Sequence, residues 1–206
     1  MNTANRQLLP RNERRLSILD GAAEAFAAAG YAATCMEDVA AATGVSKLIV
    51  YRHFESKADL YRHVLQRTLD RLAEGLQAEA ADNPVGASVR AVLRLGRQSP
   101  AALRLLLVHA AREPAFVDYA RELRSQVVDA WAVYMPLPDG LMRRWATQTA
   151  VGYVWDAVLG WLDLGEPKRD EEFIRRCTGG LHALLRGLVQ PETVKPGPWP
   201  LPPRAH

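Results

Sequence analysis

The most informative stretch of this chain covers residues 30–60 and reads GYAATCMEDVAAATGVSKLIVYRHFESKADL. It predicts two short helices joined by a tight turn. Thr34 and Glu37 have the spacing of a capping box, in which two side chains satisfy the first N–H groups of a helix, so the first helix is expected to start there. Gly44 is expected to end that helix in the left-handed conformation, and Ser46 to open the second.

Apolar spacing agrees with this division. The expected buried stripe of the first helix contains the residues at helical spacing, namely Met36, Val39, Ala40 and Thr43. The second helix covers residues 47–54, and Ser56 and Asp59 form a second capping box that opens a longer helix. A short helix, a turn containing glycine and a second short helix follow the plan of the helix-turn-helix motif.

In their order and spacing, residues 11–65 resemble the DNA-binding domain of the TetR family of transcriptional regulators. The residues that carry this resemblance are Phe26, Ala29-Gly30-Tyr31, Thr34, Asp38-Val39-Ala40, Gly44-Val45-Ser46, Tyr51, His53-Phe54, Ser56-Lys57 and Leu60. The alternative is a generic three-helix packing unit, for which Tyr51, His53 and Lys57 on one small surface would have no purpose.

The resemblance implies a set of DNA contacts. Tyr51 and His53 match the phosphate-contacting pair of the family, and Lys57 would add a cation beside a helix N-terminus already suited to phosphate. The whole expected set is Arg6, Arg11, Thr34, Met36, Glu37, Ser46, Lys47, Leu48, Ile49, Tyr51, Arg52, His53 and Lys57. Lys47 is expected to reach a base edge or a phosphate, and the role of Arg52 is open.

One departure from the family pattern concerns base recognition. Leu48 and Ile49 stand where members often have Gly-Thr, so a hydroxyl that could bond a base or phosphate is missing. Apolar side chains there can instead touch thymine methyl groups. Packing of Leu48 into the core is the alternative.

Charge is distributed rather than concentrated. Residues 1–60 hold seven Lys or Arg and seven Asp or Glu, so the strongly basic domain typical of DNA-binding proteins is absent. Four arginines nevertheless lie within residues 1–15, and Lys47, Arg52, His53 and Lys57 lie close together in the sequence. We expect modest non-specific affinity focused on few phosphates.

The rest of the chain predicts an all-α protein of about nine helices, with further helices over residues 57–81, 84–98, 100–112, 115–135, 140–164 and 169–189 after a first helix over 11–29. We expect a flexible basic arm over residues 1–10, a helix-turn-helix domain over 11–56 and an effector-binding and dimerisation domain over 57–190. The tail over 191–206 holds six prolines in sixteen residues and should be extended or disordered.

Composition excludes several classes of protein. The chain has 206 residues, of which 49% are apolar, so it can bury a core. The apolar run 101–111 is interrupted by Arg104 and His109 and is too short to span a bilayer. Cys35 and Cys177 lie far apart, which fits a reducing cytoplasm. No metal-ligand spacing, glycine-rich phosphate loop or nucleophile motif is present, so we expect no cofactor, no metal and no catalytic residue.

Aromatic residues of the second domain predict a site for a small hydrophobic or aromatic effector, since such sites are mainly apolar with a few polar groups. The expected lining is His109, Phe116, Tyr119, Trp131, Trp145, Thr149, Trp155 and Asp156. For His109 and Asp156 the alternative is an ordinary core or interface residue.

The helix over 140–164 is apolar nearly all round, so it must be buried on more than one face. TetR-like regulators dimerise through their last two long helices, which implies a homodimer here. The expected interface is Ala157, Trp161, Phe173, Cys177, Leu181, Leu184, Leu185 and Leu188. A buried monomer core is the alternative.

Together these features predict a ligand-responsive regulator that binds a pseudo-palindromic double-stranded DNA operator. Release of repression by the ligand is the common mode in the family. The competing interpretations are an all-α carrier or enzyme without DNA binding, and a nucleoid-type DNA binder without effector.

Overall fold

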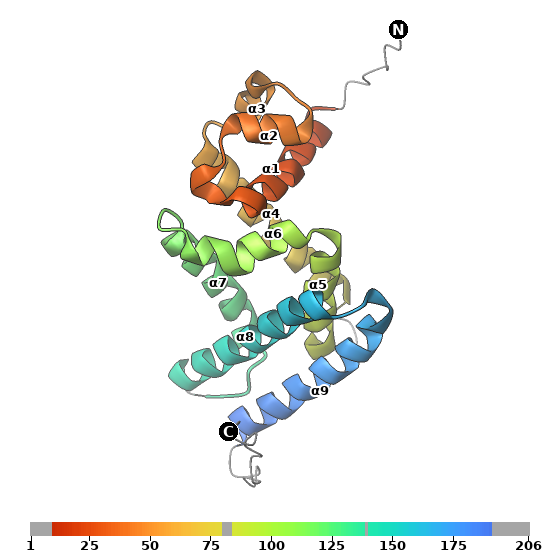
Figure 1. The fold of residues 1–206 in the computed structure, drawn as a ribbon. Coiled ribbons are helices and arrows are strands. Elements are labelled where there is room, and N and C mark those ends of the chain that lie inside the picture. Colours follow the sequence, from red (N-terminus) through yellow and green to blue (C-terminus); the bar gives the residue numbers. More distant parts are fainter. Residues whose placement is uncertain (1–9, 80–83, 139, 191–206) are drawn as a thin grey trace, which may run out of the picture.

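The computed structural model describes residues 10–79, 84–138 and 140–190, and over these residues the chain forms nine α-helices and no strand (Figure 1). The α-helices are α1 (Arg11–Ala33), α2 (Met36–Thr43), α3 (Lys47–His53), α4 (Lys57–Glu79), α5 (Pro84–Gln98), α6 (Pro100–Arg104), α7 (Val117–Ala132), α8 (Gly140–Leu164) and α9 (Asp170–Val189). The all-α prediction is therefore confirmed. The predicted tail, residues 1–9 of the predicted arm and the last residues of the helix over 57–81 lie outside the described residues.

The first helix breaks where its glycine predicted an end. Gly30 has φ 82° and ψ 161°, so α1 is interrupted there before it continues to Ala33. The predicted apolar stripe of this helix is buried and contains Ile18, Leu19, Ala22, Ala23 and Phe26.

The predicted start of α2 is wrong by one residue. Cys35, not Thr34, precedes the first turn, and the Asp38 carboxylate accepts a hydrogen bond from the Cys35 N–H at 2.7 Å. The Thr34 hydroxyl instead donates to the Gly30 carbonyl at 2.7 Å. The Thr34 N–H also donates to the Gly30 carbonyl, at 3.2 Å, so Thr34 closes α1 rather than opening α2.

The turn between α2 and α3 agrees with the prediction. Gly44 has φ 64° and ends α2 in the left-handed conformation. The Ser46 hydroxyl accepts a hydrogen bond from the Ile49 N–H at 3.4 Å and caps α3. At the start of α4, the Ser56 hydroxyl accepts from the Asp59 N–H at 3.1 Å.

The segment predicted as one helix over 100–112 changes its hydrogen bonding along its length. After α6 it continues as a π-helix, η1 (Leu105–His109), and a 3-10 turn, η2 (Ala110–Arg112). Leu105, Leu106 and Ala110 are buried, whereas His109 is exposed. A second 3-10 turn, η3 (Pro167–Arg169), connects α8 to α9.

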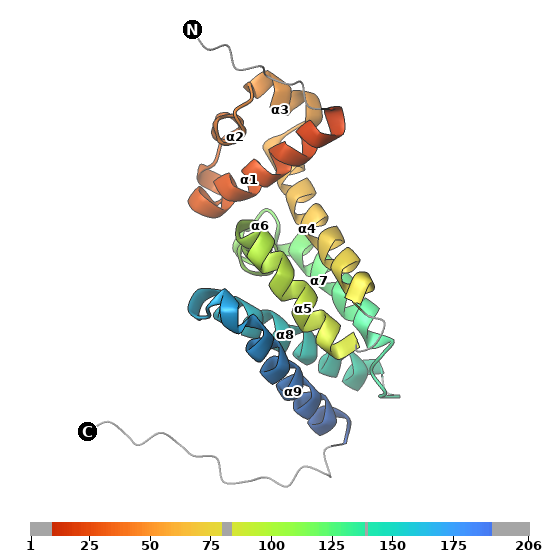
Figure 2. The same ribbon diagram turned by 90° about the vertical axis from the view of Figure 1, so that its right-hand side faces the viewer.

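Two apolar clusters organise the molecule. The head cluster joins α1, α2, α3 and the first half of α4 to α6, η1 and the first half of α7. The body cluster joins Leu72 of α4 and Val128 of α7 to α5, α8 and α9. Figures 1 and 2 show α1–α3 at one end of the molecule and α9 at the other, with α4 running from the head into the body. None of the described helices is both long and apolar enough to cross a bilayer.

Candidate DNA-binding face and ligand pocket

One face of α3 is open to solvent and carries the residues best placed to meet DNA. We call it the recognition face, and it consists of Lys47, Leu48, Tyr51 and Arg52, all of which are exposed. On the opposite side of α3, Val50 is buried in the head cluster and Phe54 follows it. The helical spacing of these two sets therefore anchors α3 on one side and presents it on the other.

Neighbouring side chains fix the position of the Lys47 ammonium on this face. The Lys47 ammonium forms an ion pair with the Glu37 carboxylate and lies 5.7 Å from the centre of the Tyr51 ring. The hydrogen bond from Lys47 lowers the pKa of Glu37 and raises that of Lys47, so both groups stay ionised at neutral pH. Glu37 thus positions the Lys47 ammonium. Because both side chains remain open to solvent, this ion pair can still be broken.

His53 lies beside a group of cations. Burial lowers the pKa of its imidazole, and Arg11, Arg15 and Arg14 lower it further. The ring is therefore neutral at pH 7 and can donate one N–H to a phosphate. Arg15 itself lies over the Phe54 ring, with its guanidinium carbon 5.1 Å from the ring centre.

Lys57 has a different environment from that of an open phosphate contact. Its ammonium donates to the carbonyls of Tyr31 at 2.8 Å, Thr34 at 2.9 Å and Ala32 at 3.3 Å. It also lies 4.4 Å from the centre of the Tyr31 ring. An ammonium group has three N–H donors, so this clasp, as we call the contacts of Lys57 with the end of α1, engages all of them.

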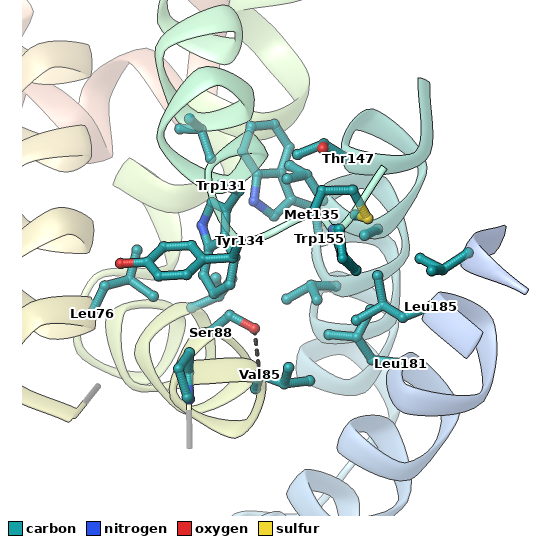
Figure 3. A pocket seen from close by; sticks show the side chains of 18 of the residues that line it. Leu76, Val85, Ser88, Trp131, Tyr134, Met135, Thr147, Trp155, Leu181 and Leu185 are labelled. Atoms are coloured by element: carbon teal, nitrogen blue, oxygen red, sulfur yellow. Dashed lines mark hydrogen bonds between the residues drawn. The ribbon is translucent and has the colours of Figure 1, made fainter. Parts of the chain in front are cut away.

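The body contains an apolar pocket of about 560 Å³, which is within the size range of sites for small molecules. Side chains from α4, α5, α7, α8 and α9 and from the connection between α7 and α8 line it (Figure 3). Figure 3 shows Trp131 and Trp155 on one side, with Leu181 and Leu185 of α9 on another. Ser88 and Thr147 are among its few polar side chains, and both donate to backbone carbonyls.

Comparison with known proteins agrees with this arrangement. The family model described as bacterial regulatory proteins, tetR family, matches residues 18–64. The chain is also 33% identical over 168 residues to the HTH-type transcriptional activator FasR of Mycolicibacterium smegmatis, covering 77% of each protein. The chain belongs to the TetR family. It is a DNA-binding transcriptional regulator.

Solved structures share the fold of this TetR-family regulator. A TetR-like transcriptional regulator from Rhodococcus sp. RHA1 superposes with a TM-score of 0.72 at 21% identity, over 88% of this chain and 99% of the other. AibR, solved in complex with isovaleryl coenzyme A and operator DNA, superposes with a TM-score of 0.60 at 19% identity, over 81% and 97%.

Several residues of the expected set of DNA contacts are not accessible to DNA. Thr34 and Met36 are buried, at 1% and 4% exposed, because the first closes α1 and the second packs into the head cluster. Ile49 is half-buried and packs against the same cluster, so the thymine-contact hypothesis is left to Leu48. Lys57 is occupied by the clasp. Arg6 lies outside the described residues.

The remaining members of that set are placed as a DNA-facing surface requires. Arg11, Glu37 and Ser46 are exposed beside the recognition face, and His53 is half-buried. The core-packing alternative for Leu48 is wrong, since this side chain is 63% exposed. An exposed leucine on a recognition helix is available for apolar base contacts.

The predicted effector residues divide into three groups. Trp131 and Trp155 line the pocket. Phe116 and Tyr119 pack at the head cluster instead, because they precede or begin α7 on the side of the head. The other four lie outside the pocket: His109 and Asp156 are exposed, Trp145 is 47% exposed, and the Thr149 hydroxyl donates to the Trp145 carbonyl at 2.9 Å.

The predicted dimer residues are mostly part of the protomer itself. Cys177 and Leu181 are buried in the body cluster, and Ala157, Leu184 and Leu185 pack against it. Leu181 and Leu185 also line the pocket. The Trp161 and Phe173 rings stack with centres 4.9 Å apart, and the Trp161 indole donates to Asp170 at 2.7 Å. Leu188 is half-buried. Periodicity identified these residues as apolar, and their contact with a second copy stays a prediction.

The sequence interpretation missed most of the pocket. Its unpredicted lining includes Leu72, Leu76, Val85, Ser88, Met135, Thr147, Val151 and Val154. The apolar stripe of α4 and the all-round apolar character of α8 were visible signals. They did not show which apolar positions would face a cavity rather than another side chain.

Base recognition by Leu48 can be tested directly. We expect Leu48→Ala to weaken preference at one or two base pairs by about 1 kcal/mol, because it removes an apolar contact to a base edge. Selection from a randomised DNA pool measures this preference. Leu164→Ala is the matched control, since Leu164 is 89% exposed and is not part of the recognition face. Identical selected motifs for Leu48→Ala and the unmodified protein would exclude Leu48 from base recognition.

Proposed function

We propose that this regulator is a homodimeric repressor whose two α3 helices bind successive major grooves of a pseudo-palindromic operator, and that a small apolar ligand in the pocket releases it. One observation carries the ligand response: α4 connects both sites. Its first half contributes Tyr61 and Leu65 to the head cluster, and its second half contributes Leu72 and Leu76 to the pocket wall. A ligand that displaces the second half would reorient the head.

The α7 helix supports the same coupling. Leu123 near its start packs in the head cluster, whereas Val127 and Trp131 near its end line the pocket. Two rigid helices therefore span the distance between ligand and DNA. Coupling of about 1–3 kcal/mol between such sites is typical of allosteric proteins.

The relatives support a regulator that binds both DNA and a ligand, and they differ in the direction of the response. AibR was solved with both isovaleryl coenzyme A and operator DNA, so this fold accommodates both kinds of partner. FasR is named an activator, whereas a repressor that is 38% identical over 42% of this chain occurs in Mycobacterium tuberculosis.

The proposal is tested by DNA binding with and without ligand. Mobility-shift titration with DNA flanking the protein's own coding sequence should show a site bound at least a thousandfold more tightly than scrambled DNA. Absence of any preferred site would favour the carrier or enzyme alternative. A preferred site with no ligand effect, after a thermal-shift screen of apolar compounds, would favour a regulator without effector.

The outer faces of α8 and α9 are the surfaces that we assign to the second copy. Gly160 and Gly179 are exposed, and a Cβ placed on either would meet no atom within 4 Å. Leu141 and Trp145, at 76% and 47% exposed, add apolar area to the outside of α8. Small residues allow two helices to approach closely, and exposed apolar side chains are stabilised by burial in an interface.

Gly179→Arg should give a folded monomer. Arginine favours a helix more than glycine does, so the protomer keeps its stability, while an unpaired charge in the interface is costly. Sedimentation velocity at micromolar concentration measures the association state. Gly179→Ala is the control and should remain dimeric, and a dimeric Gly179→Arg would show that this face of α9 is not the interface.

A further inference from the structure

The pocket has an unusual balance of charge. Among the described residues that line it, Arg186 alone carries a formal charge, and no aspartate, glutamate or lysine joins it. No described carboxylate forms an ion pair with Arg186. In contrast, Arg90 and Arg97 of α5 and Arg176 of α9 each form an ion pair with a carboxylate. Among the described residues, the cation of the pocket therefore has no acidic partner.

Arg186 lies at the mouth of the pocket. The exposed lining residues are Pro84, Tyr134, Pro136, Arg186 and Gln190, which come from the beginning of α5, the connection after α7 and the end of α9. The buried lining residues, such as Val92, Val154 and Trp155, form the interior. A molecule that enters would pass the guanidinium and place its far end among apolar side chains.

The other described polar groups inside the pocket are few, and none of them is an acid. Trp155 is 7% exposed, and no described residue accepts a hydrogen bond from its indole N–H. The hydroxyl hydrogens of Ser88 and Thr147 are already donated to the carbonyls of Val85 at 2.6 Å and Arg143 at 2.7 Å. Figure 3 shows the Ser88 bond at the wall of the pocket. The Trp155 indole therefore remains able to donate to an acceptor oxygen of a ligand, whereas the two hydroxyl oxygens can only accept.

We infer that the ligand is an apolar molecule with one carboxylate, whose chain fills the interior and whose carboxylate binds Arg186 at the mouth. This inference deepens the proposed ligand-responsive function and rests on it. A guanidinium binds a carboxylate through two parallel N–H bonds. At the mouth, the carboxylate keeps part of its hydration, so it does not incur the large cost of burying a charge. A cation of the same shape would be repelled.

The inference is tested by calorimetric titration of the full chain with decanoate, 1-decanol and decylamine, which share one chain and differ in head-group charge. Decanoate should bind about tenfold more tightly than 1-decanol, a ratio equal to about 1.4 kcal/mol, and decylamine should bind most weakly. Shortening the acid to octanoate should weaken binding about fourfold per methylene removed, as burial of each methylene predicts.

Arg186→Gln assigns the head-group contact. This variant should bind decanoate no more tightly than 1-decanol and should leave 1-decanol affinity unchanged. Arg175→Gln is the matched control, because Arg175 is exposed on the same helix and does not line the pocket. Equal binding of the acid and the alcohol to the unmodified protein, no binding of either, or an acid preference that survives in Arg186→Gln would each overturn the inference.

Operator binding separates this inference from the proposed function. If decanoate binds through Arg186 and operator affinity does not change, the ligand class stands and the proposed ligand response is contradicted. If an uncharged apolar ligand alone releases the operator, the proposed response stands and the carboxylate inference fails.

Discussion

Phe116→Ala is expected to lower the free energy of unfolding by about 3–5 kcal/mol, the usual cost of truncating a buried phenylalanine. Phe116 is 1% exposed and precedes α7. Its ring centre lies 4.7 Å from that of Tyr31 on α1 and 4.5 Å from that of Tyr61 on α4. Tyr61 is itself 1% exposed, and this burial raises the pKa of its hydroxyl to about 12. Urea denaturation measures the loss.

The control for this prediction is Val133→Ala. Val133 is 76% exposed, so its truncation should change stability by less than about 0.5 kcal/mol. A loss below about 1 kcal/mol in Phe116→Ala would mean that the head cluster closes around the missing ring, and that α7 is not held to the head by this contact.

Phe116→Leu asks whether the same contact transmits the ligand signal. A volume-conserving apolar exchange costs less than about 1.5 kcal/mol, so the variant should fold and bind both ligand and operator. The effect of ligand on operator affinity should nevertheless shrink, because ring-to-ring contact between α7 and α1 is lost. An unchanged ligand effect would assign the coupling to α4 alone.

Lys57→Met is expected to lower the free energy of unfolding by about 2 kcal/mol, since hydrogen bonds to a charged donor contribute about 1.5–3 kcal/mol when buried and this clasp is partly open to solvent. Methionine keeps the apolar stem of the side chain and removes the ammonium. The carbonyls of Tyr31 and Thr34 then lose their donor. Chemical denaturation measures the change.

The salt dependence of DNA binding distinguishes the clasp from a phosphate contact. If Lys57 acts through the clasp, Lys57→Met leaves the slope of log affinity against log salt unchanged. If Lys57 leaves the carbonyls and binds a phosphate, the slope falls by about one unit and stability hardly changes. Arg52→Met is the control, because Arg52 is exposed on the recognition face and should reduce the slope while leaving stability within about 0.5 kcal/mol.

The helices and the recognition face were predictable because their determinants are local. Glycine at position 44 adopts a conformation that other residues avoid, and Ser46 caps the helix that follows it. Helical spacing alone separates Val50, which is buried, from Leu48 and Tyr51, which are exposed. The boundaries of α8 at residues 140 and 164 were likewise readable from the breaks that flank an apolar segment.

The destinations of side chains were not predictable in the same way. Thr34 and Cys35 each have an acid three residues later, and Cys35 caps α2 because both the hydroxyl and the N–H of Thr34 bond back to the Gly30 carbonyl. The Lys57 ammonium is a group that can bind phosphate, yet its hydrogen-bond partners are carbonyls that the fold of α1 places beside it.

Sequence alone was therefore sufficient for the fold class, the helix-turn-helix and the exposed side of α3, because hydrogen bonding within helices and the spacing of apolar residues are properties of neighbouring residues. Which apolar side chains face the pocket, the head cluster or a second copy depends on how helices pack. Trp155, Phe116 and Leu185 are equally apolar in sequence, but one lines a cavity, one joins α7 to the head and one closes the pocket from α9. Periodicity says that such a residue is buried; the crossing of helices far apart in the chain decides what buries it.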